Sequence, residues 1–267
     1  MLGLTNKITR YKKISAAYNK FALSFDGTDD YVDTNASFQA TFRNSFTVSC
    51  WQNSSTYNSS DVLWGVADTA NNDFIKLFQR GTHNKICFQF KSDGANHRKN
   101  ENVASFDASS GLDGAWVNWV VTVTKPETGT DKIITQIYKN GAARAHAADS
   151  SFQDANTGDD MAATDIDQDL YIGSFHANTG SNTNDIDCLI DEWAIWNTAL
   201  DADAVAAIYN SGVPFNLKSD KGNYDNSSNL VAYYNFNEGS GTTATDLTGG
   251  SNGTINNATY STNAPGV

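Results

Sequence analysis

The sequence CLIDEWAIWNTALDADAVAAIYNSG, residues 188–212, decides the fold of this chain. Its first half predicts a β-strand, in which successive side chains point to opposite faces. One face carries Leu189, Asp191, Trp193 and Ile195, and the other carries Ile190, Glu192, Ala194 and Trp196. Because both faces are largely apolar, we expect this strand to lie in the centre of a sheet.

A short helix is expected directly after this strand. Asp201 is a residue type favoured at a helix N-cap, and Val205 and Ile208 lie three residues apart beyond it. Gly212 suits the end of such a helix, because glycine adopts the left-handed backbone that closes many helices.

The rest of the chain reads as roughly a dozen short strands separated by turn residues. FALSFDGTDDYVD, residues 21–33, predicts a hairpin that turns at Asp26-Gly27, and Asn140-Gly141 predicts a second hairpin. Further apolar runs are FTVSCW (46–51), WVNWVVTVT (116–124), LYIGS (170–174) and LVAYYNF (230–236). The pattern predicts an all-β protein of two antiparallel sheets with one short helix.

Charge and cysteine content exclude several classes of partner. The 267 residues carry a net charge of −12, which argues against nucleic acid and anionic membranes and permits divalent cations. The cysteines Cys50, Cys87 and Cys188 each lie inside an apolar run, so we expect buried free thiols rather than disulfides or a zinc site.

The chain divides into a basic arm and one domain. Residues 1–20 carry the cations Lys7, Arg10, Lys12, Lys13 and Lys20 and show neither a signal peptide nor a membrane span. The arm is either mobile or docks onto an acidic neighbouring subunit, and both alternatives stay open. We expect residues 21–267 to form a single domain, in which residues 228–267 add strands to the same sandwich.

Several motifs occur in an order that resembles a known family. They are ALSFDGTDDYVD, FTVSCW, the W-x-x-W-V-V-T-V run, IYKNG, LYIGS and IDEWAIWNTALDADAVAAIYNSG, over roughly residues 21–212. This set resembles the laminin-G-like, concanavalin A-like jelly-roll domains. In that family the segment like LVAYYNFNEGSGTTATDLTGGSNGTI commonly precedes the first hairpin, whereas here it comes last. The resemblance implies an antiparallel two-sheet jelly-roll sandwich whose members bind sugars or proteins, or build extended surfaces.

The resemblance also implies a structural calcium, which many members carry. It places the first hairpin beside the IDE strand, so that Asp26, Asp30 and Asp191 are the candidate ligands. Calcium takes several oxygen ligands, and carboxylates supply them. The alternative is that these carboxylates accept backbone N–H bonds at turns.

Catalysis is not predicted. On a strand, Asp165, Asp167 and Asp169 would share one face, as the acids of related sandwich-fold glycosidases do. However, all three are the shorter aspartate and they lie where a loop enters a strand. The four histidines, including His176, fall in polar stretches that indicate solvated surface.

Aromatic residues offer a second kind of site, because sugar rings stack on them. The sequence has six tryptophans, at positions 51, 64, 116, 119, 193 and 196. Most lie in strongly apolar strands, so core packing is expected for four or five of them. Trp64, next to the glycine of LWGVAD, is the candidate ligand contact.

These features favour a non-enzymatic virion protein of a bacteriophage, a capsid decoration or tail adhesion protein assembled in the host cytoplasm. The arm would bind other virion proteins, the sandwich would be displayed as a homo-oligomer, and a host-surface glycan is a further partner. The alternative is a secreted carbohydrate-binding lectin domain. A glycoside hydrolase, acting through Asp167, is a third class.

Overall fold

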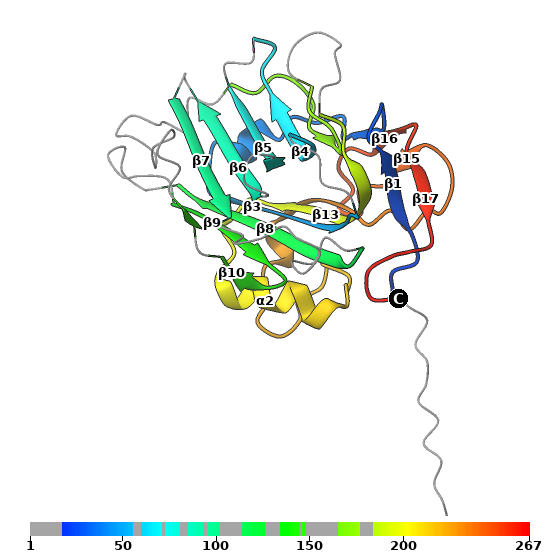
Figure 1. Ribbon diagram of the computed structural model, residues 1–267. Coiled ribbons are helices and arrows are strands. Elements are labelled where there is room, and N and C mark those ends of the chain that lie inside the picture. Colours follow the sequence, from blue (N-terminus) through cyan, green and yellow to red (C-terminus); the bar gives the residue numbers. More distant parts are fainter. Residues whose placement is uncertain are drawn as a thin grey trace, which may run out of the picture.

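The computed structural model describes residues 18–55, 60–70, 73–80, 85–92, 95–101, 114–125, 134–144, 146–147, 165–176 and 184–267. These residues form two antiparallel sheets that stack face to face (Figure 1). The predicted all-β jelly-roll sandwich is confirmed. The basic arm falls largely outside the described residues, which begin at Tyr18.

Sheet A has the strand order β10-β9-β8-β3-β13-β1-β17, and β14 also pairs with β13. Its strands are β1 (Ala22–Asp26), β3 (Phe46–Asn53), β8 (Trp116–Thr124), β9 (Ile134–Lys139), β10 (Ala142–Ala143), β13 (Asp187–Trp196), β14 (Leu230–Tyr234) and β17 (Thr259–Ser261). β13 lies between β3 and β1, so the strand expected at the centre of a sheet is indeed central.

Sheet B has the strand order β11-β7-β6-β5-β4-β12-β2-β16-β15. Its strands are β2 (Tyr31–Asp33), β4 (Val62–Ala67), β5 (Phe74–Arg80), β6 (Lys85–Ser92), β7 (Ala95–Glu101), β11 (His146–Ala147), β12 (Tyr171–Ile172), β15 (Thr243–Ala244) and β16 (Gly253–Asn256). The short strand β12 joins β4 to β2, which are otherwise separate parts of the chain.

The main core fills the space between the sheets with inward-facing side chains of both. It includes Phe46, Trp119 and Trp193 from sheet A and Trp64 and Phe88 from sheet B. Five tryptophans, all except Trp116, are buried, as their apolar surroundings predict. The three cysteines are also buried and form no disulfide.

The predicted hairpin at residues 21–33 is wrong. β1 pairs with β13 and β17 in sheet A, whereas β2 pairs with β12 and β16 in sheet B. Side chains satisfy two backbone N–H groups of the turn: the Asp30 carboxylate accepts from Asp26 N (2.8 Å), and the Asp26 carboxylate accepts from Thr28 N (2.9 Å). The turn therefore carries the chain from one sheet to the other. The hairpin at Asn140-Gly141, in contrast, is confirmed by the pairing of β9 with β10.

A β-bulge in β13 changes which side chains face the core. The pairing register with β3 shifts between Asp191 and Ala194, and Glu192 has a left-handed backbone with φ near +50°. Ile190 and Trp193 therefore both belong to the core between the sheets, although strict alternation puts them on opposite faces. As a result, Asp191 and Glu192 lie next to each other on the outer face of sheet A.

Helix α2 (Ala202–Tyr209) covers this outer face (Figure 1). Asp201 is its N-cap as predicted, and its carboxylate accepts a hydrogen bond from Ala204 N (2.8 Å). The helix ends at Tyr209 because Asn210, rather than Gly212, takes the left-handed conformation first, with φ near +47°. A 3-10 turn, η4 (Asn210–Gly212), follows. One turn of helix that the sequence does not signal, α1 (Gln39–Phe42), precedes β3.

A strap, residues 213–224, completes the cover over sheet A. The Trp196 indole N–H donates to the Tyr224 hydroxyl (3.1 Å), which donates in turn to the Leu217 carbonyl (2.7 Å). These side chains form a second cluster with apolar residues of α2 and sheet A: Val120, Tyr138, Ala194, Trp196, Leu200, Ala204, Val205, Ile208, Leu217, Tyr224 and Tyr233. The outer face of sheet A is thus sealed.

The C-terminal strands join both sheets. After the 3-10 turn η5 (Ser227–Asn229), β14 pairs with β13 and β17 pairs with β1 in sheet A. β15 and β16 form a hairpin whose second strand pairs with β2 in sheet B.

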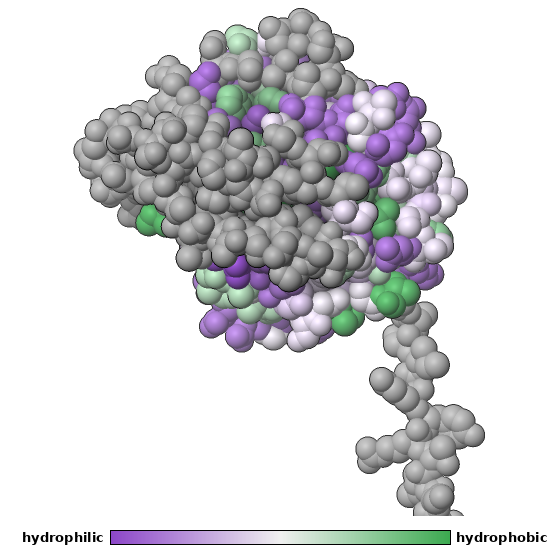
Figure 2. All heavy atoms as spheres, in the orientation of Figure 1, coloured by the Kyte–Doolittle hydropathy of each residue, from purple (hydrophilic) through white to green (hydrophobic). Residues whose placement is uncertain are grey.

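The outer surface of the described residues is mainly polar. Figure 2 shows hydrophilic and neutral residues over most of the visible described surface, with hydrophobic residues only in small separate spots. Among the described residues, only Tyr18, Ile134, Val213 and Val267 are large exposed hydrophobic residues. No helix of the described chain is long and apolar enough to cross a membrane.

Candidate functional site

Trp64 has no surface for a ligand. Its side chain is fully buried in the core between the sheets, with its ring 6.3 Å from the ring of Phe88. The sequence predicts a ligand contact here because Trp64 stands beside a glycine, but the strand turns its indole inward. Gly65 faces outward instead, and the ring of Phe175 packs directly over it, so that a Cβ there would lie 2.6 Å from Phe175 Cδ2.

The candidate calcium ligands divide into two separate groups. Asp26 and Asp30 lie together at the β1–β2 turn with Asp29, and one carboxylate oxygen from each lies within 4.8 Å of the others. Asp191 does not join them, because the register of β1 with β13 places Asp187 opposite Asp26. Asp191 lies four residues further along β13, a distance of about 13 Å at the usual rise of a strand.

The donor set at the turn fits a hard cation such as calcium. All three residues offer carboxylate oxygens, the ligand type that calcium prefers. Burial raises the pKa of Asp30, and the charges of Asp26, Asp29 and Asp185 add to this effect. Part of the set also has another role, because Asp26 and Asp30 each accept a backbone hydrogen bond that shapes the turn.

Asp191 and Glu192 form a buried acid pair on the sealed face. Asp191 accepts hydrogen bonds from the Asn19 side-chain amide and from Glu192 N (2.8 Å). Glu192 accepts one from the Tyr233 hydroxyl, which also contacts the Tyr18 hydroxyl at 2.9 Å. Burial raises the pKa of Glu192 from 4.5 to about 8, and burial together with the Glu192 charge raises the pKa of Asp191 well above its usual value. At neutral pH the pair therefore holds at least one proton.

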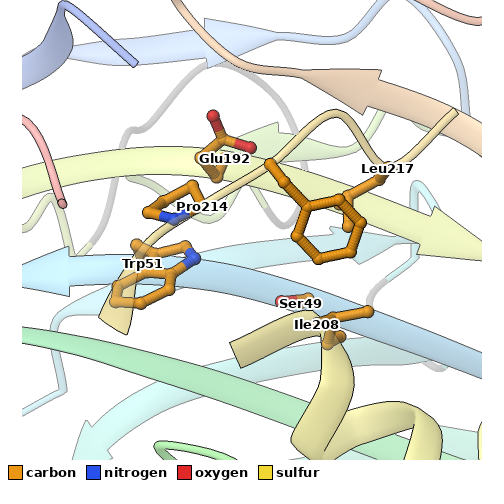
Figure 3. A pocket seen from close by; sticks show the side chains of 7 residues that line it. Ser49, Trp51, Glu192, Ile208, Pro214 and Leu217 are labelled. Atoms are coloured by element: carbon orange, nitrogen blue, oxygen red, sulfur yellow. The ribbon is translucent and has the colours of Figure 1, made fainter. Parts of the chain in front are cut away.

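Glu192 also lines a cavity beneath the strap (Figure 3). The cavity has a volume of about 10 Å³, which is room for about one water molecule. Figure 3 shows Glu192 beside Trp51 and Pro214, with Ser49, Ile208 and Leu217 on the remaining sides. Such a space is too small for a sugar, so this region seals and supports the fold.

The aspartates at 165, 167 and 169 do not form a catalytic face. The segment is not a strand, and hydrogen bonds to other groups occupy two of the three. Asp167 accepts from Thr69 N and from the Thr69 hydroxyl (both 2.7 Å). A hydrogen bond from Gln168, followed by those from Thr69, lowers the pKa of Asp167. Asp165 accepts from Gln39 (2.8 Å) and lies 3.6 Å from the Arg43 guanidinium. Asp167 therefore acts as a cap for the loop at Thr69.

A cluster of aromatic and acidic side chains lies on the outer face of sheet B. The inward-facing residues of its strands there are Val32, Ile172 and Ile255, so alternation turns Tyr31, Asp33 and Tyr171 outward. Tyr171 lies directly opposite Asp33 in the pairing of β12 with β2. We call Tyr31, Asp33, Asp169, Tyr171, His176 and Asp185 the aromatic–acid patch.

Three rings of the aromatic–acid patch are in direct contact. His176 stacks on Tyr171, with ring centroids 3.8 Å apart and planes 16° apart, and meets the Tyr31 ring edge-on at 4.7 Å. The Tyr31 and Tyr171 rings are 5.5 Å apart. All three side chains are half-buried, so each keeps part of its surface open to solvent. Within the described part of the chain, neither tyrosine hydroxyl has a hydrogen-bond partner.

Carboxylates surround these rings. Burial, followed by the charges of Asp33 and Asp169, raises the pKa of Tyr171 to about 12. Burial raises the pKa of Asp185, although the Ser174 hydroxyl donates a hydrogen bond to it. Burial lowers the pKa of His176, while Asp185 and Asp33 act in the opposite direction. The patch thus combines aromatic surface, free hydroxyl groups and hydrogen-bond acceptors.

Most of this patch does not follow from the sequence. His176 lies in a polar stretch that predicts solvated surface, and Asp169 stands out only as a candidate catalytic acid. No motif singles out Tyr31 or Tyr171. The alternation in YVD and LYIGS does put Tyr31 and Tyr171 on outward faces. What the sequence does not show is that β2 pairs with β12. Tyr31 and Tyr171 are 140 residues apart, and no sequence feature connects the two strands.

A second hollow lies at the end of the sandwich near α1. It has a volume of about 490 Å³ and is lined by Ala40, Thr41, Asn44, Ser45 and Asn197. None of these residues is aromatic or charged, so the hollow lacks a stacking surface. The aromatic–acid patch is therefore the stronger candidate.

Comparison with known proteins agrees with the architecture. Residues 26–206 match the family model described as the concanavalin A-like lectin/glucanases superfamily, laminin G type. No protein with curated annotation matches the chain.

Solved structures share the fold at low sequence identity. A "putative carbohydrate binding protein" from Bacteroides ovatus superposes with a TM-score of 0.60 at 18% identity, over 95% of this chain and 63% of that chain. The chain thus spans less than two thirds of the length of that protein. The CBM40 domain of the Ruminococcus gnavus IT-sialidase, bound to α2,3-sialyllactose, superposes with a TM-score of 0.50 at 14% identity, over 70% and 96% of the two chains. A SAP-like pentraxin from Limulus polyphemus gives a TM-score of 0.50 at 11% identity, over 73% and 84%.

Proposed function

Because the chain belongs to the concanavalin A-like lectin/glucanases superfamily, we propose that it is a carbohydrate-binding domain without catalytic activity. The aromatic–acid patch on the outer face of sheet B is its binding site. The observation that carries the proposal is the contact of Tyr31, Tyr171 and His176 on an outward face, beside carboxylates and with tyrosine hydroxyls that no described residue hydrogen-bonds.

The chemistry of this patch suits a sugar. The C–H faces of a pyranose ring pack on aromatic rings, and its hydroxyl groups need both donors and acceptors. Tyr31 and Tyr171 offer rings and hydroxyls on neighbouring strands, and Asp33 and Asp169 offer acceptors next to them. The strands hold these side chains in place, so little ordering is needed on binding.

The names of two structural relatives point the same way. The Bacteroides ovatus protein is named for carbohydrate binding, and the Ruminococcus gnavus domain is a complex with a sialylated sugar. At 18% and 14% identity these relatives support the choice of ligand class and nothing finer.

A glycoside hydrolase is not proposed. Two acids at a set separation are needed to cleave a glycosidic bond, and one of the pair must be free to attack or to activate water. Asp167, the candidate for that role, is held by Thr69 and Gln168. The phage virion role, the homo-oligomer, the arm-mediated virion contacts and the virion location stay predictions, because neither the fold nor the relatives bear on them.

The proposal is tested by glycan binding and one pair of variants. The domain is screened on a glycan array that includes neutral, amine-bearing and acidic sugars, and hits are measured by calorimetry. We expect Tyr171→Ala to weaken binding at least tenfold, about 1.4 kcal/mol, because it removes the central ring of the patch. Tyr260→Ala is the matched control, since Tyr260 is also half-buried but lies on β17 at the edge of sheet A.

Two results would overturn the proposal. One is the absence of binding to any glycan by a folded domain. The other is an equal loss of affinity in Tyr171→Ala and Tyr260→Ala, which would place the site elsewhere.

A further inference from the structure

The aromatic–acid patch carries unbalanced negative charge. Asp33, Asp169 and Asp185 form no ion pair among the described residues, and Asp169 makes no hydrogen bond there either. Burial lowers the pKa of His176 from its usual 6.5, so its imidazole is uncharged at neutral pH. Among the described residues, the patch therefore presents carboxylates and aromatic rings without a cation beside them.

Asp33 and Asp169 repel each other, and Asp185 is repelled by acids of the β1–β2 turn. Burial raises the pKa of Asp169, and the neighbouring charge of Asp33 adds to the rise. Burial also raises the pKa of Asp185, and the charges of Asp29 and Asp26 from the β1–β2 turn add to it. A positive group placed among them would relieve this repulsion, because an opposite charge nearby favours the ionised carboxylate.

The nearby lysine on sheet B does not supply that positive charge. In strand register, Tyr171 lies opposite Gly65, and Gly65 lies opposite Lys76, so Lys76 is two strands away from Tyr171. Phe175 packs over Gly65, between Tyr171 and Lys76. The Lys76 ammonium lies 4.6 Å from the Phe175 ring centroid and within 5.3 Å of the Phe74 and Phe78 ring centroids, which holds it on the far side.

We propose that the aromatic–acid patch binds an amine-bearing saccharide, of the glucosamine type, in preference to neutral sugars and against anionic ones. This inference rests on the proposed carbohydrate-binding function and adds the ligand class. The sugar ring packs on Tyr31 and Tyr171, and the ammonium group lies among Asp33, Asp169 and Asp185. The aromatic faces also favour the cation, since a ring face attracts positive charge.

The chain as a whole reinforces this preference. Its net charge of −12 repels anionic sugars and attracts cationic ones at long range, which changes association rates more than the geometry of the complex. A specific site differs from this general attraction, because it depends on particular carboxylates. The test must therefore separate Asp169 from the other acids of the surface.

The experiment compares three probes on the full chain by calorimetry, at a pH where the sugar amine is protonated. The probes are the trisaccharide of glucosamine, its fully N-acetylated counterpart and α2,3-sialyllactose. We expect the glucosamine trisaccharide to bind at least tenfold more tightly than the N-acetylated one, and sialyllactose to bind most weakly. Asp169→Asn should reduce this preference several-fold, because it weakens binding of the glucosamine trisaccharide much more than binding of the N-acetylated probe.

Asp225→Asn is the matched control, because Asp225 is an exposed acid beside Tyr224 on the sealed side of the molecule. It makes the same change in net charge and should leave the preference intact.

Equal affinities for the amine and N-acetyl probes, or an equal effect of Asp225→Asn and Asp169→Asn, would overturn the proposed ligand class. If Tyr171→Ala nevertheless abolishes binding of the N-acetylated or sialylated probe, the proposed carbohydrate-binding function is kept and only the preference for amine-bearing saccharides is rejected. The absence of any Tyr171-dependent binding would overturn both.

Discussion

The outer faces of the two sheets carry similar residues and use them differently. On sheet A, Trp51, Tyr233 and Glu192 lie beneath α2 and the strap, and Asp191 lies beside them, hydrogen-bonded to Asn19; all four are buried from solvent. On sheet B, the tyrosines, histidine and acids of the aromatic–acid patch are largely half-buried and keep open surface. In both places aromatic rings and carboxylates are neighbours, so composition does not tell a structural cluster from a binding site.

The cover over each face makes the difference. On sheet A several buried polar groups find partners elsewhere in the chain, as when Asn19 donates to Asp191 and Tyr224 accepts from Trp196. On sheet B the hydroxyls of Tyr31 and Tyr171 have no such partner among the described residues. An unburied polar group costs little without a partner because water satisfies it, and a ligand can later replace that water.

The largest effect of a substitution is expected on the sealed face. Trp196→Ala removes a fully buried ring and the hydrogen bond from its indole to Tyr224, and should lower the free energy of unfolding by about 3–5 kcal/mol. Chemical denaturation measures this loss. Tyr171→Ala, on the open face, should cost less than about 1 kcal/mol in the same assay. Equal losses in the two variants would show that the open face is also part of the packed structure.

A smaller effect is expected from the buried acids, as a pH dependence of stability. The pKa of Glu192 rises from 4.5 to about 8 on folding, so the folded state holds its proton more tightly than the unfolded state. The contribution is fully present below about pH 4.5, falls as the pH rises, and is lost above about pH 8. The unfolding free energy of the wild type should therefore decrease between about pH 5 and pH 8, by on the order of 1–3 kcal/mol.

Glu192→Gln tests this origin, because an amide does not titrate and can still accept from the Tyr233 hydroxyl. Its denaturation midpoints should vary less with pH than those of the wild type over the same range. Asp169→Asn is the comparison on the open face, where water screens the charge and the change in slope should be much smaller. Parallel pH profiles for wild type and Glu192→Gln would rule out Glu192 as the source.

Local sequence patterns predicted the architecture better than they predicted the site. The strand at 187–196, the helix capped by Asp201 and the Asn140-Gly141 turn each follow from residues that are adjacent in sequence. The bulge at Glu192 could not be predicted in this way, because its left-handed backbone is set by pairing with β3 and not by its own preference. The bulge, in turn, places two acids side by side.

The aromatic–acid patch could not be predicted from the sequence for a related reason. The hairpin expected at residues 21–33 would have paired β2 with β1, whereas β2 in fact pairs with β12 and brings Tyr31 close to Tyr171 and His176. The sequence favours Trp64 as a ligand contact because it stands beside a glycine, yet its strand turns it into the core. Long-range pairing decides which outward side chains become neighbours, and short motifs do not carry that information.

The smallest effect is expected at the β1–β2 turn, where we propose a structural calcium held by Asp26, Asp29 and Asp30. Millimolar calcium should stabilise the domain by about 1 kcal/mol, seen as a small rise in melting temperature that a chelator reverses. Asp29→Asn should abolish the rise, because Asp29 contributes a ligand and takes part in neither backbone hydrogen bond of the turn.

Glu192→Gln separates this site from the buried acid pair. Its stability should respond to calcium as the wild type does, since the register of β13 keeps Asp191 and Glu192 well away from Asp26. If the calcium-dependent rise in melting temperature were lost in Glu192→Gln but kept in Asp29→Asn, the ion would bind at the sealed face and not at the turn.

Calcium at the turn should also affect the aromatic–acid patch. The acids of the turn act on Asp185, so calcium bound there would weaken the attraction of the patch for an amine. The preference for glucosamine should therefore be strongest in calcium-free buffer.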